Sequence, residues 1–175
     1  MQKLYFLSID KSFIQDLYYT YNLDINVSQK RNWNKKESKK RIREEENMKL
    51  TVEGIKNQEA WKKAGIALPG YDVEKVSQKA KEEPGWVHFG IGNIFRVFIG
   101  GIADGLLEEG VLDRGITCVE TFDYDVVDKI YDPYDNLGLS VILHGDGTRE
   151  HKVLGSLAEA VKAQSSDQAQ WNRMK

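Results

Sequence analysis

The fold is decided by the stretch Trp86-Val-His-Phe-Gly-Ile-Gly-Asn93. Its first four residues form a short apolar run, and a glycine turn follows at once in residues 90–93, as at the end of a buried β-strand. Residues 94–109 then predict a helix with a wide buried face, because their apolar side chains recur at helical spacing. These side chains are Ile94, Phe95, Phe98, Ile99, Ile102, Leu106 and Leu107.

A second strand is predicted directly after this helix. Gly110 stands where a helix commonly ends, and residues 115–119 form the next apolar run. Glu120 closes that run and places a carboxylate at the end of the strand. A strand, glycine turn, helix, strand and terminal acid in this order make up the βαβ unit that binds nucleotides. We therefore expect an α/β protein with a Rossmann-like dinucleotide-binding domain.

Each part of this unit has a chemical role toward a dinucleotide such as NAD. Glycine lets the chain turn sharply and lets a pyrophosphate approach the backbone. The helix offers free N–H groups and its positive dipole end to the phosphates. Glu120 can accept hydrogen bonds from the ribose hydroxyls, and its charge disfavours the 2′-phosphate of NADP. The candidate cofactor-binding residues are Gly90, Ile91, Gly92, Asn93, Ile94, Phe95, Arg96 and Glu120.

Two features of the site leave alternatives open. The dinucleotide fingerprint G-x-G-x-x-G has Phe95 at its third glycine position, and Arg96 is either a cation for the pyrophosphate or an ordinary surface arginine. A methyltransferase that uses S-adenosylmethionine has the same turn and acid, although its motif usually begins with an acid where this chain has His88. Binding of NADH or of S-adenosylmethionine separates these two enzyme classes.

The composition is that of a globular protein without extreme charge. Of the 175 residues, 41% are hydrophobic and 30% are charged, and the formal net charge is −2. This balance gives no global reason to expect nucleic acid or an anionic membrane as a partner. Cys118 is the single cysteine, which excludes an intrachain disulfide and fits a reducing compartment. With neither a transmembrane-length apolar run nor a secretory signal, we expect a cytoplasmic protein.

The first 47 residues differ in composition from the rest of the chain. Ten basic and seven acidic residues give them a net +3, and they contain no Gly, Pro, His or Ala. Residues 29–43 hold eight basic residues that could bind a nucleic acid, but such runs are usually solvated, and we favour that interpretation. Residues 43–47 can be encoded by purine-rich codons that resemble a ribosome-binding site just before Met48. We hypothesise that residues 1–47 are a non-homologous, disordered or mis-annotated extension.

The remaining elements are predicted from periodicity and turn residues. An Asp-Gly turn in residues 145–148 lies between two apolar runs and predicts a β-hairpin near the C-terminus, with strands at 139–143 and 151–154. Four further helices are predicted by composition and turn signals, at 57–64, 73–82, 156–164 and 167–175.

No metal site is predicted. The three histidines lack ligand partners at zinc spacing. We expect His88 to be structural, with a position near the phosphates as the alternative, and His144 and His151 to face solvent. Cys118 is expected to be an inert core residue. A run of aspartates lacks the glycine and glutamate of a calcium-binding EF-hand and is predicted to be a solvated helix surface. Its members are Asp123, Asp125, Asp128, Asp132 and Asp135.

The motif His88-Phe-Gly-Ile-Gly-Asn-Ile-Phe-Arg96 resembles the signature of the mannitol dehydrogenase family. This family of long-chain polyol dehydrogenases includes mannitol 2-dehydrogenase and fructuronate reductase (mannonate oxidoreductase), and its motif also lacks the third glycine. The stretch from Glu120 to Leu137 is similar to the fructuronate reductase branch. The resemblance runs from about Met48 to Lys175, so we assign residues 48–175 to the N-terminal part of a dinucleotide-binding domain.

The resemblance implies an NAD-dependent oxidoreductase that acts on the CH–OH group of a sugar alcohol or an aldonate. Gly90 and Gly92 would line the pyrophosphate, residues 93–96 would form its helix-end site, and Glu120 would contact the adenosine ribose. The family's catalytic lysine, with its asparagine and histidine partners, lies in a C-terminal helical domain that no part of this chain matches. We therefore expect no catalytic residue and no turnover. We also expect poor folding, because half of a doubly wound sheet leaves an open edge and a bare apolar face.

Overall fold

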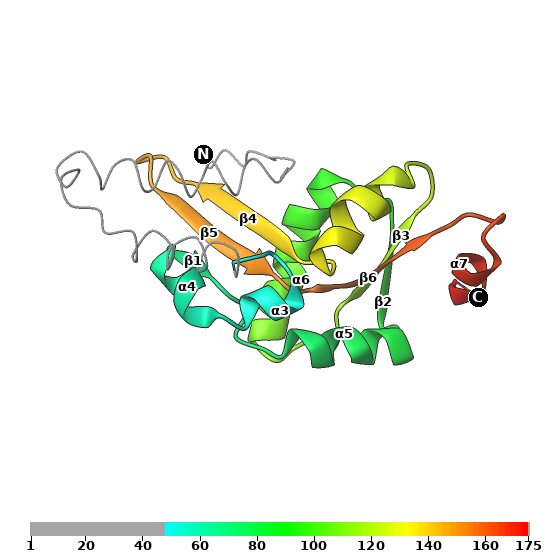
Figure 1. Cartoon of the computed structure of the whole chain (residues 1–175), viewed down its shortest axis with the longest axis horizontal. Helices are drawn as coiled ribbons and strands as arrows, with labels where there is room; N and C mark the ends of the chain where they lie inside the picture. Colours follow the sequence, from blue (N-terminus) through cyan, green and yellow to red (C-terminus); the bar gives the residue numbers. More distant parts are fainter. Residues whose placement is uncertain (1–47, 175) are drawn as a thin grey trace, which may run out of the picture.

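Three parallel strands form one sheet, and the first two of them, joined by a helix, form the βαβ unit that the sequence predicts. The three strands are β2 (Trp86–Phe89), β3 (Ile116–Glu120) and β6 (Leu157–Lys162), in the sheet order β2-β3-β6. The computed structural model that shows them describes residues 48–174 (Figure 1), so the hypotheses about residues 1–47 and their basic segment 29–43 lie outside the described residues. All five residues of β3 are buried, because β3 is the central strand with a neighbour on each side.

The crossover from β2 to β3 is one helix in two parts. Helical backbone begins at Asn93 and passes through the π-helical segment η1 (Phe95–Ile99) into α6 (Gly100–Glu108). The chain then leaves the helix at Gly110, whose φ of 69° is left-handed and therefore favours glycine. The predicted helix at 94–109 is confirmed, but its first half has the wider π geometry, which is common at functional sites.

Only part of the predicted apolar face of this helix is buried. Phe95 and Leu107 face the core, whereas Ile94, Phe98 and Ile102 are exposed. These three exposed residues follow one another at intervals of four and so form one stripe along the helix. The expectation of a wide buried face is wrong for this stripe, because no element of residues 48–174 covers it.

Residues 156–164 contain a strand and not the predicted helix. β6 runs parallel to β3, with Thr117 opposite Glu159, and its Leu157 and Val161 are buried. Alanine, leucine and glutamate favour a helix locally, but pairing with β3 and packing against α5 (Val73–Glu82) override that preference. This correction shows that tertiary pairing, and not local propensity, sets the structure of this segment.

A second sheet, of order β1-β5-β4, lies beside the parallel one (Figure 1). β4 (Gly138–Leu143) and β5 (Arg149–Leu154) form the predicted antiparallel hairpin, and β1 (Ile66–Ala67) pairs in parallel with β5. Asp146 fixes the hairpin turn, since its Oδ1 accepts the Thr148 N–H at 2.9 Å. The hairpin is thus confirmed, while β1 was not predicted.

The predicted helices at 57–64, 73–82 and 167–175 are confirmed. Asp72 begins the second of them, because its Oδ1 accepts the Lys75 N–H at 3.0 Å as an N-cap. Within residues 48–174, no helix has the length and apolar character that a membrane crossing needs. In the described part of the chain, the helices outside the crossover other than α5 are α3 (Val52–Ile55), α4 (Gln58–Lys63), η2 (Val127–Tyr131), η3 (Asp132–Tyr134) and α7 (Gln168–Arg173).

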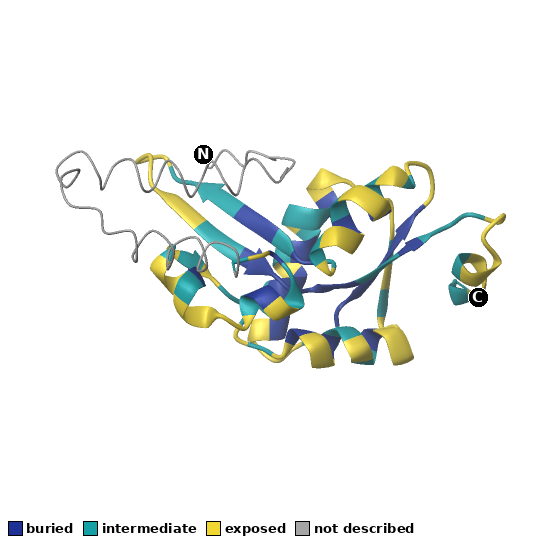
Figure 2. Ribbon diagram, viewed as in Figure 1, coloured by how far each residue is buried: buried dark blue, intermediate teal, exposed yellow. Residues whose placement is uncertain are grey.

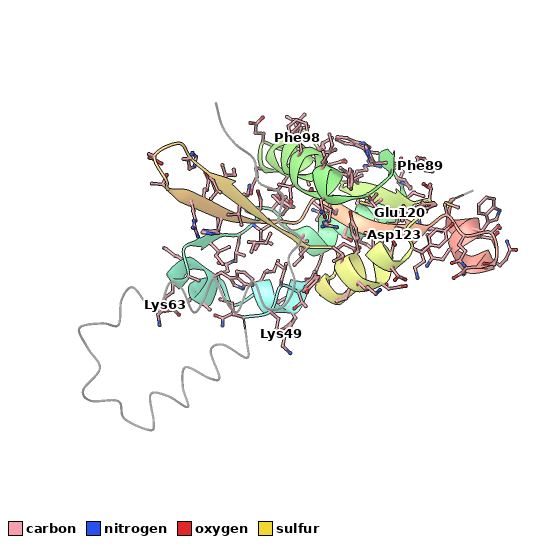
Figure 3. All side chains as sticks on the ribbon, turned by 90° about the horizontal axis from the view of Figure 1, so that it is seen from above. Lys49, Lys63, Phe89, Phe98, Glu120 and Asp123 are labelled. Atoms are coloured by element: carbon pink, nitrogen blue, oxygen red, sulfur yellow. The ribbon has the colours of Figure 1, made fainter. Side chains whose placement is uncertain are left out.

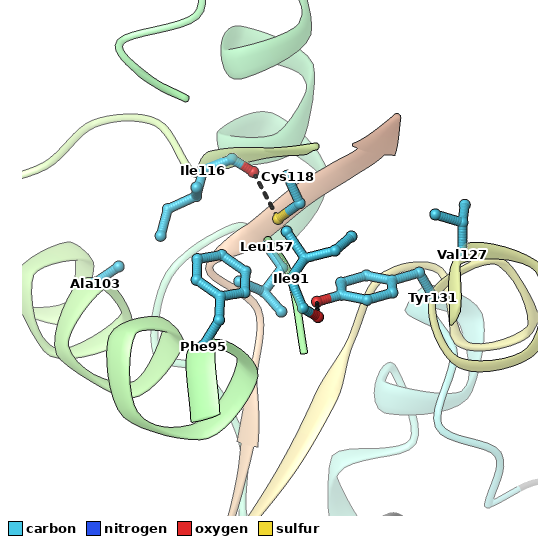
Figure 4. Packing of buried hydrophobic residues seen from close by; sticks show 8 residues of the cluster. All are labelled: Ile91, Phe95, Ala103, Ile116, Cys118, Val127, Tyr131 and Leu157. Carbon is cyan, nitrogen blue, oxygen red and sulfur yellow. Dashed lines mark hydrogen bonds between the residues drawn. The ribbon is translucent and has the colours of Figure 1, made fainter. Parts of the chain in front are cut away.

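Two hydrophobic clusters stabilise the described region, and Figure 2 shows buried residues in strands such as β3 and β6 and in parts of the helices. The first cluster lies between the crossover helix, the parallel sheet and η2 (Figure 4). Its buried members are Ile91, Phe95, Ala103, Ile116, Cys118, Val127, Tyr131 and Leu157. The second cluster lies under the hairpin around Trp61, whose Nε1–H donates to the Gly54 carbonyl at 2.9 Å. The parallel sheet and the hairpin sheet thus each have their own core.

A buried carboxylate ties the crossover helix to the hairpin sheet. Asp104 is fully buried in α6, and its Oδ1 accepts hydrogen bonds from the Tyr71 hydroxyl and, at 3.0 Å, from the Gly155 N–H. Lys152 in β5 places its Nζ 2.7 Å from Asp104 Oδ2 and 3.2 Å from Glu108 Oε1. Burial alone would lower the pKa of Lys152, but the two carboxylates raise it above its usual value, so this lysine stays charged.

Candidate nucleotide-binding site

The glycine turn after β2 borders a pocket at the surface. Gly90 has a φ of 83°, which strongly favours glycine, and its N–H donates to the Val119 carbonyl of β3 at 2.9 Å. A side-chain carbon added at Gly90 or Gly92 would meet no atom within 4 Å, so both residues border open space. That space is a pocket of about 370 Å³ lined by His88, Gly90, Gly92, Asn93, Ile94, Phe95 and Ile99.

Packed side chains hold the glycine turn in place. Ile91 is fully buried, and its carbonyl accepts the Tyr131 hydroxyl at 2.7 Å. Phe95 is also buried, and its ring stacks on His88 with 4.3 Å between centroids. The stacking on Phe95 fits a structural role for His88, but the imidazole also lines the pocket, so its alternative role near the phosphates stays open. No pattern in the sequence indicates the contact with Tyr131, which lies 40 residues away from Ile91.

Arg96 is held in place at the start of the helix. Its guanidinium donates a hydrogen bond to the Asn93 side chain and lies 5.7 Å from the centre of the Tyr131 ring. Burial lowers the pKa of Arg96 from its ordinary value, but a guanidinium remains charged in proteins. A fixed, half-buried cation thus lies beside the glycine turn, where an anionic group could be bound.

Glu120 is almost fully buried and organises the loop that follows β3. Its Oε1 accepts the backbone N–H groups of Thr121, Phe122 and Asp123 at 2.9, 3.0 and 3.3 Å. These bonds leave its Oε2 available and fix the direction of the carboxylate. The sequence predicted the carboxylate but not this loop contact, which depends on the backbone turning back over the side chain.

The parallel sheet brings the glycine turn and Glu120 together at the carboxyl ends of β2 and β3. Phe89 pairs with Val119 at the ends of β2 and β3, so the glycine turn and Glu120 leave the sheet at neighbouring positions. Figure 3 shows Phe89 and Glu120 on the same side of the molecule. Open glycine backbone, a fixed cation and a fixed carboxylate are therefore close together, an arrangement that suits a ligand with both phosphate and hydroxyl groups.

A run of aspartates and three histidines were also singled out from the sequence, and Asp123 of that run lies next to Glu120. The five aspartates of residues 123–135 are exposed, as predicted. His151 is a correction, because its Nε2 is buried without a hydrogen-bond partner and burial lowers its pKa below the ordinary value. It lies in the middle of β5, between β1 and β4, and the residue as a whole is partly exposed. No group of three or more potential metal ligands occurs in residues 48–174.

Cys118 should be unreactive in the folded chain. It is completely buried in β3, and burial, followed by the nearby charge of Glu159, raises the pKa of its thiol, so the reactive thiolate is disfavoured. Titration with a chromogenic disulfide at mildly alkaline pH should detect no thiol in the native protein and one thiol after unfolding in urea. Equally fast labelling of native and unfolded protein would contradict the buried position.

Comparison with known proteins relates the chain to sugar-alcohol and sugar-acid oxidoreductases. No protein-family model matches it. It is 46% identical over 128 residues to the D-mannonate oxidoreductase of Thermotoga maritima, a match that covers 73% of this chain and 24% of that protein. The chain thus spans about a quarter of the length of this curated relative.

Two solved structures share the fold. A D-sorbitol dehydrogenase in substrate-free form superposes with a TM-score of 0.51 at 25% identity, over 63% of this chain and 22% of that one. The Pseudomonas fluorescens mannitol 2-dehydrogenase, in a ternary complex with NAD and D-mannitol, superposes with a TM-score of 0.50 at 26% identity. That match covers 60% of this chain and 20% of the dehydrogenase. These similarities support the predicted resemblance to the mannitol dehydrogenase family.

Proposed function

We propose that the described region binds the pyrophosphate and adenosine ribose of NAD. The observation that carries this proposal is the glycine turn, where Gly90 and Gly92 border an open pocket next to the carboxylate that ends the neighbouring strand. An NAD pyrophosphate fits there, because the two glycines leave room for it against the backbone. The mannitol 2-dehydrogenase relative was solved with NAD, which supports the choice of cofactor.

The proposed roles divide among backbone and side-chain groups. The N–H groups of residues 91–95 would face the phosphates at the start of the helix, with Ile91 and Phe95 contributing backbone alone. Arg96 would balance the phosphate charge from its position over Tyr131. Glu120 would accept a ribose hydroxyl through Oε2, while Oε1 keeps the following loop in place. The exposed side chain of Ile94 would form one wall of the pocket.

We infer that the intact protein is an NAD-dependent oxidoreductase of the CH–OH group of a sugar alcohol or an aldonate. The names of the relatives, which are mannonate, sorbitol and mannitol enzymes, support this substrate class. NAD, when bound, accepts the hydride that leaves the substrate carbon. The role of the residues described is to bind and orient the cofactor, and we place the protein in the cytoplasm, in agreement with its single cysteine.

A competition experiment tests the proposal. NADH is titrated into the full chain and its fluorescence followed, first alone and then with fragments of the cofactor. ADP-ribose should displace NADH about as well as NAD does, and nicotinamide mononucleotide should not, because the proposed contacts are on the adenosine side. S-adenosylmethionine serves as the comparison for the methyltransferase alternative. Displacement by S-adenosylmethionine, or no NADH binding at all, would refute the proposal.

Replacing Glu120 by glutamine should weaken NADH binding and reduce discrimination against NADPH. The amide can still accept the loop N–H groups through its oxygen, but it loses the charge that repels a 2′-phosphate. We expect NADH affinity to fall roughly tenfold, about 1.4 kcal/mol, and NADPH affinity to stay the same or rise. Glu120→Ala should also loosen the loop, and equal loss for both nucleotides in Glu120→Gln would contradict the proposed ribose contact.

A further inference from the structure

Tyr131 contacts the glycine turn from the core side. It ends η2, is 1% exposed, and its hydroxyl donates a hydrogen bond to the Ile91 carbonyl at 2.7 Å (Figure 4). That carbonyl and the Gly92 N–H belong to one planar trans peptide group, so they point in opposite directions. The hydroxyl therefore holds the Gly92 N–H so that it faces away from Tyr131. Gly92 lines the pocket, and no group of residues 48–174 accepts this N–H.

The ring of the same tyrosine holds the cation of the site. The Arg96 guanidinium lies 5.7 Å from the ring centre and also donates a hydrogen bond to the Asn93 side chain. Because a free arginine side chain has many rotamers, these two contacts restrict where its charge lies. Tyr131 thus contacts two groups that we propose to bind the pyrophosphate, which are the backbone of the turn and Arg96.

The helix η2 is held against the parallel sheet independently of the turn. Lys162 of β6 places its Nζ 2.5 Å from Asp128 Oδ1 in η2, and the Tyr124 hydroxyl, just before η2, donates to the Ala163 carbonyl at 2.9 Å. Burial raises the pKa of Tyr131 above its usual range, so its hydroxyl stays protonated and remains a donor. The position of this donor is therefore set by contacts outside the glycine turn.

The hydroxyl of Tyr131 has a role that filling of the core does not explain. A phenylalanine would fill the same space, and the cost of burying the hydroxyl is offset by its bond to Ile91. Arg96 and Tyr131 both lie in π-helical segments, η1 and η2, and such segments are rare and frequent at functional sites. These features indicate that Tyr131 belongs to the site as well as to the core.

We infer that Tyr131 is a positioning residue of the nucleotide site, which acts on the ligand through Gly92 and Arg96. Its hydroxyl holds the Ile91 carbonyl so that the Gly92 N–H faces a phosphate oxygen, and its ring holds Arg96 beside the same phosphate. Tyr131 itself is buried and does not touch the ligand. The inference rests on the proposed function, because it takes the pyrophosphate of NAD as the group bound at the turn.

Two substitutions separate the roles of the hydroxyl and the ring. Tyr131→Phe removes the bond to Ile91 and keeps the ring beside Arg96, so NADH affinity in a fluorescence titration of the full chain should fall roughly three- to tenfold. Tyr131→Leu removes both contacts and should lower the affinity roughly three- to tenfold further. In an Arg96→Ala background the two Tyr131 variants should bind NADH equally, because the ring then has no cation to hold.

Val127→Ala is the matched control for loosening of the core. Val127 begins η2, is 2% exposed and belongs to the same hydrophobic cluster, but its side chain cannot hydrogen-bond to the turn. This variant should lower the urea midpoint and keep the NADH affinity of the wild type. Circular dichroism and urea unfolding show whether each variant is folded. If Tyr131→Leu is unfolded, Tyr131→Phe, which removes a single oxygen atom, decides the question.

The outcomes separate this inference from the proposed function. No NADH binding by the wild-type chain would overturn both. If the wild type binds NADH, an unchanged affinity in Tyr131→Phe would overturn the inference alone, and so would an equal loss in Val127→Ala. The inference also fails if the two Tyr131 variants differ as much in the Arg96→Ala background as in the wild type, because Tyr131 would then not act through Arg96.

Discussion

Replacing Gly92 by aspartate should abolish NADH binding without unfolding the chain. An added side chain at Gly92 meets no atom within 4 Å and projects toward the pocket, so the carboxylate would stand where we place the pyrophosphate. Two such charges about 4 Å apart repel by roughly 4 kcal/mol at the effective dielectric constant of a protein surface. After screening by salt, we expect a loss of affinity of about 100-fold, measured by fluorescence titration.

Gly92 is a cleaner test position than Gly90. Gly90 has a φ of 83°, so any side chain there strains the backbone and mixes a folding effect with a binding effect. Gly145→Asp is the matched control, because it adds the same charge in the hairpin turn, where an added side chain also meets no atom within 4 Å. Unchanged NADH affinity in Gly92→Asp would show that the pyrophosphate does not lie against this turn.

Replacing Asp104 by alanine should produce the largest loss of stability. The substitution removes the acceptor of the Tyr71 hydroxyl and the Gly155 N–H and leaves the Lys152 ammonium facing the vacated site. Removal of one partner from a buried ion pair typically costs 3–5 kcal/mol. Because Lys152 is 27% exposed and can turn toward water, we expect about 3 kcal/mol, seen as a lower urea midpoint or a lost cooperative transition.

Two further variants identify the cause of that loss. Asp104→Asn can still accept the two hydrogen bonds but no longer neutralises Lys152, so its stability should fall between those of the wild type and Asp104→Ala. Asp113→Ala is the surface control, because Asp113 contacts Lys79 and Arg114 in solvent, where ion pairs contribute less than about 1 kcal/mol. If Asp113→Ala and Asp104→Ala lowered the free energy of unfolding equally, burial would not make the Asp104 contacts more stabilising than a surface ion pair.

The sequence was sufficient to predict the βαβ unit because the relevant signals are local. The apolar run before Gly90, the glycine turn, the helical period after it and the acid at Glu120 all lie within 35 residues. Each follows from steric or periodic rules that act on neighbouring residues. The family motif from His88 to Arg96 lies in the same stretch, which is why the resemblance and the physical interpretation agree.

The same local reasoning was wrong where distant contacts decide the structure. Residues 157–162 have helix-forming side chains, yet they form β6 because β3 supplies hydrogen bonds and α5 covers them. The buried Nε2 of His151 follows from the strands on both sides of β5. The exposed stripe at Phe98 could not be predicted either, because helical periodicity marks an apolar face without saying what covers it.

From the sequence one could predict the class of fold, the order of strand, glycine turn, helix and strand, and a set of candidate site residues. Turn geometry and hydrophobic period are properties of short segments and need no knowledge of the whole chain. The tertiary structure alone decided how Glu120 and Arg96 are held, which edge of the sheet is open, and how Asp104 joins the two sheets. These features depend on contacts between segments far apart in the chain, whose pairing is set by the sum of burial and hydrogen bonding over the whole domain.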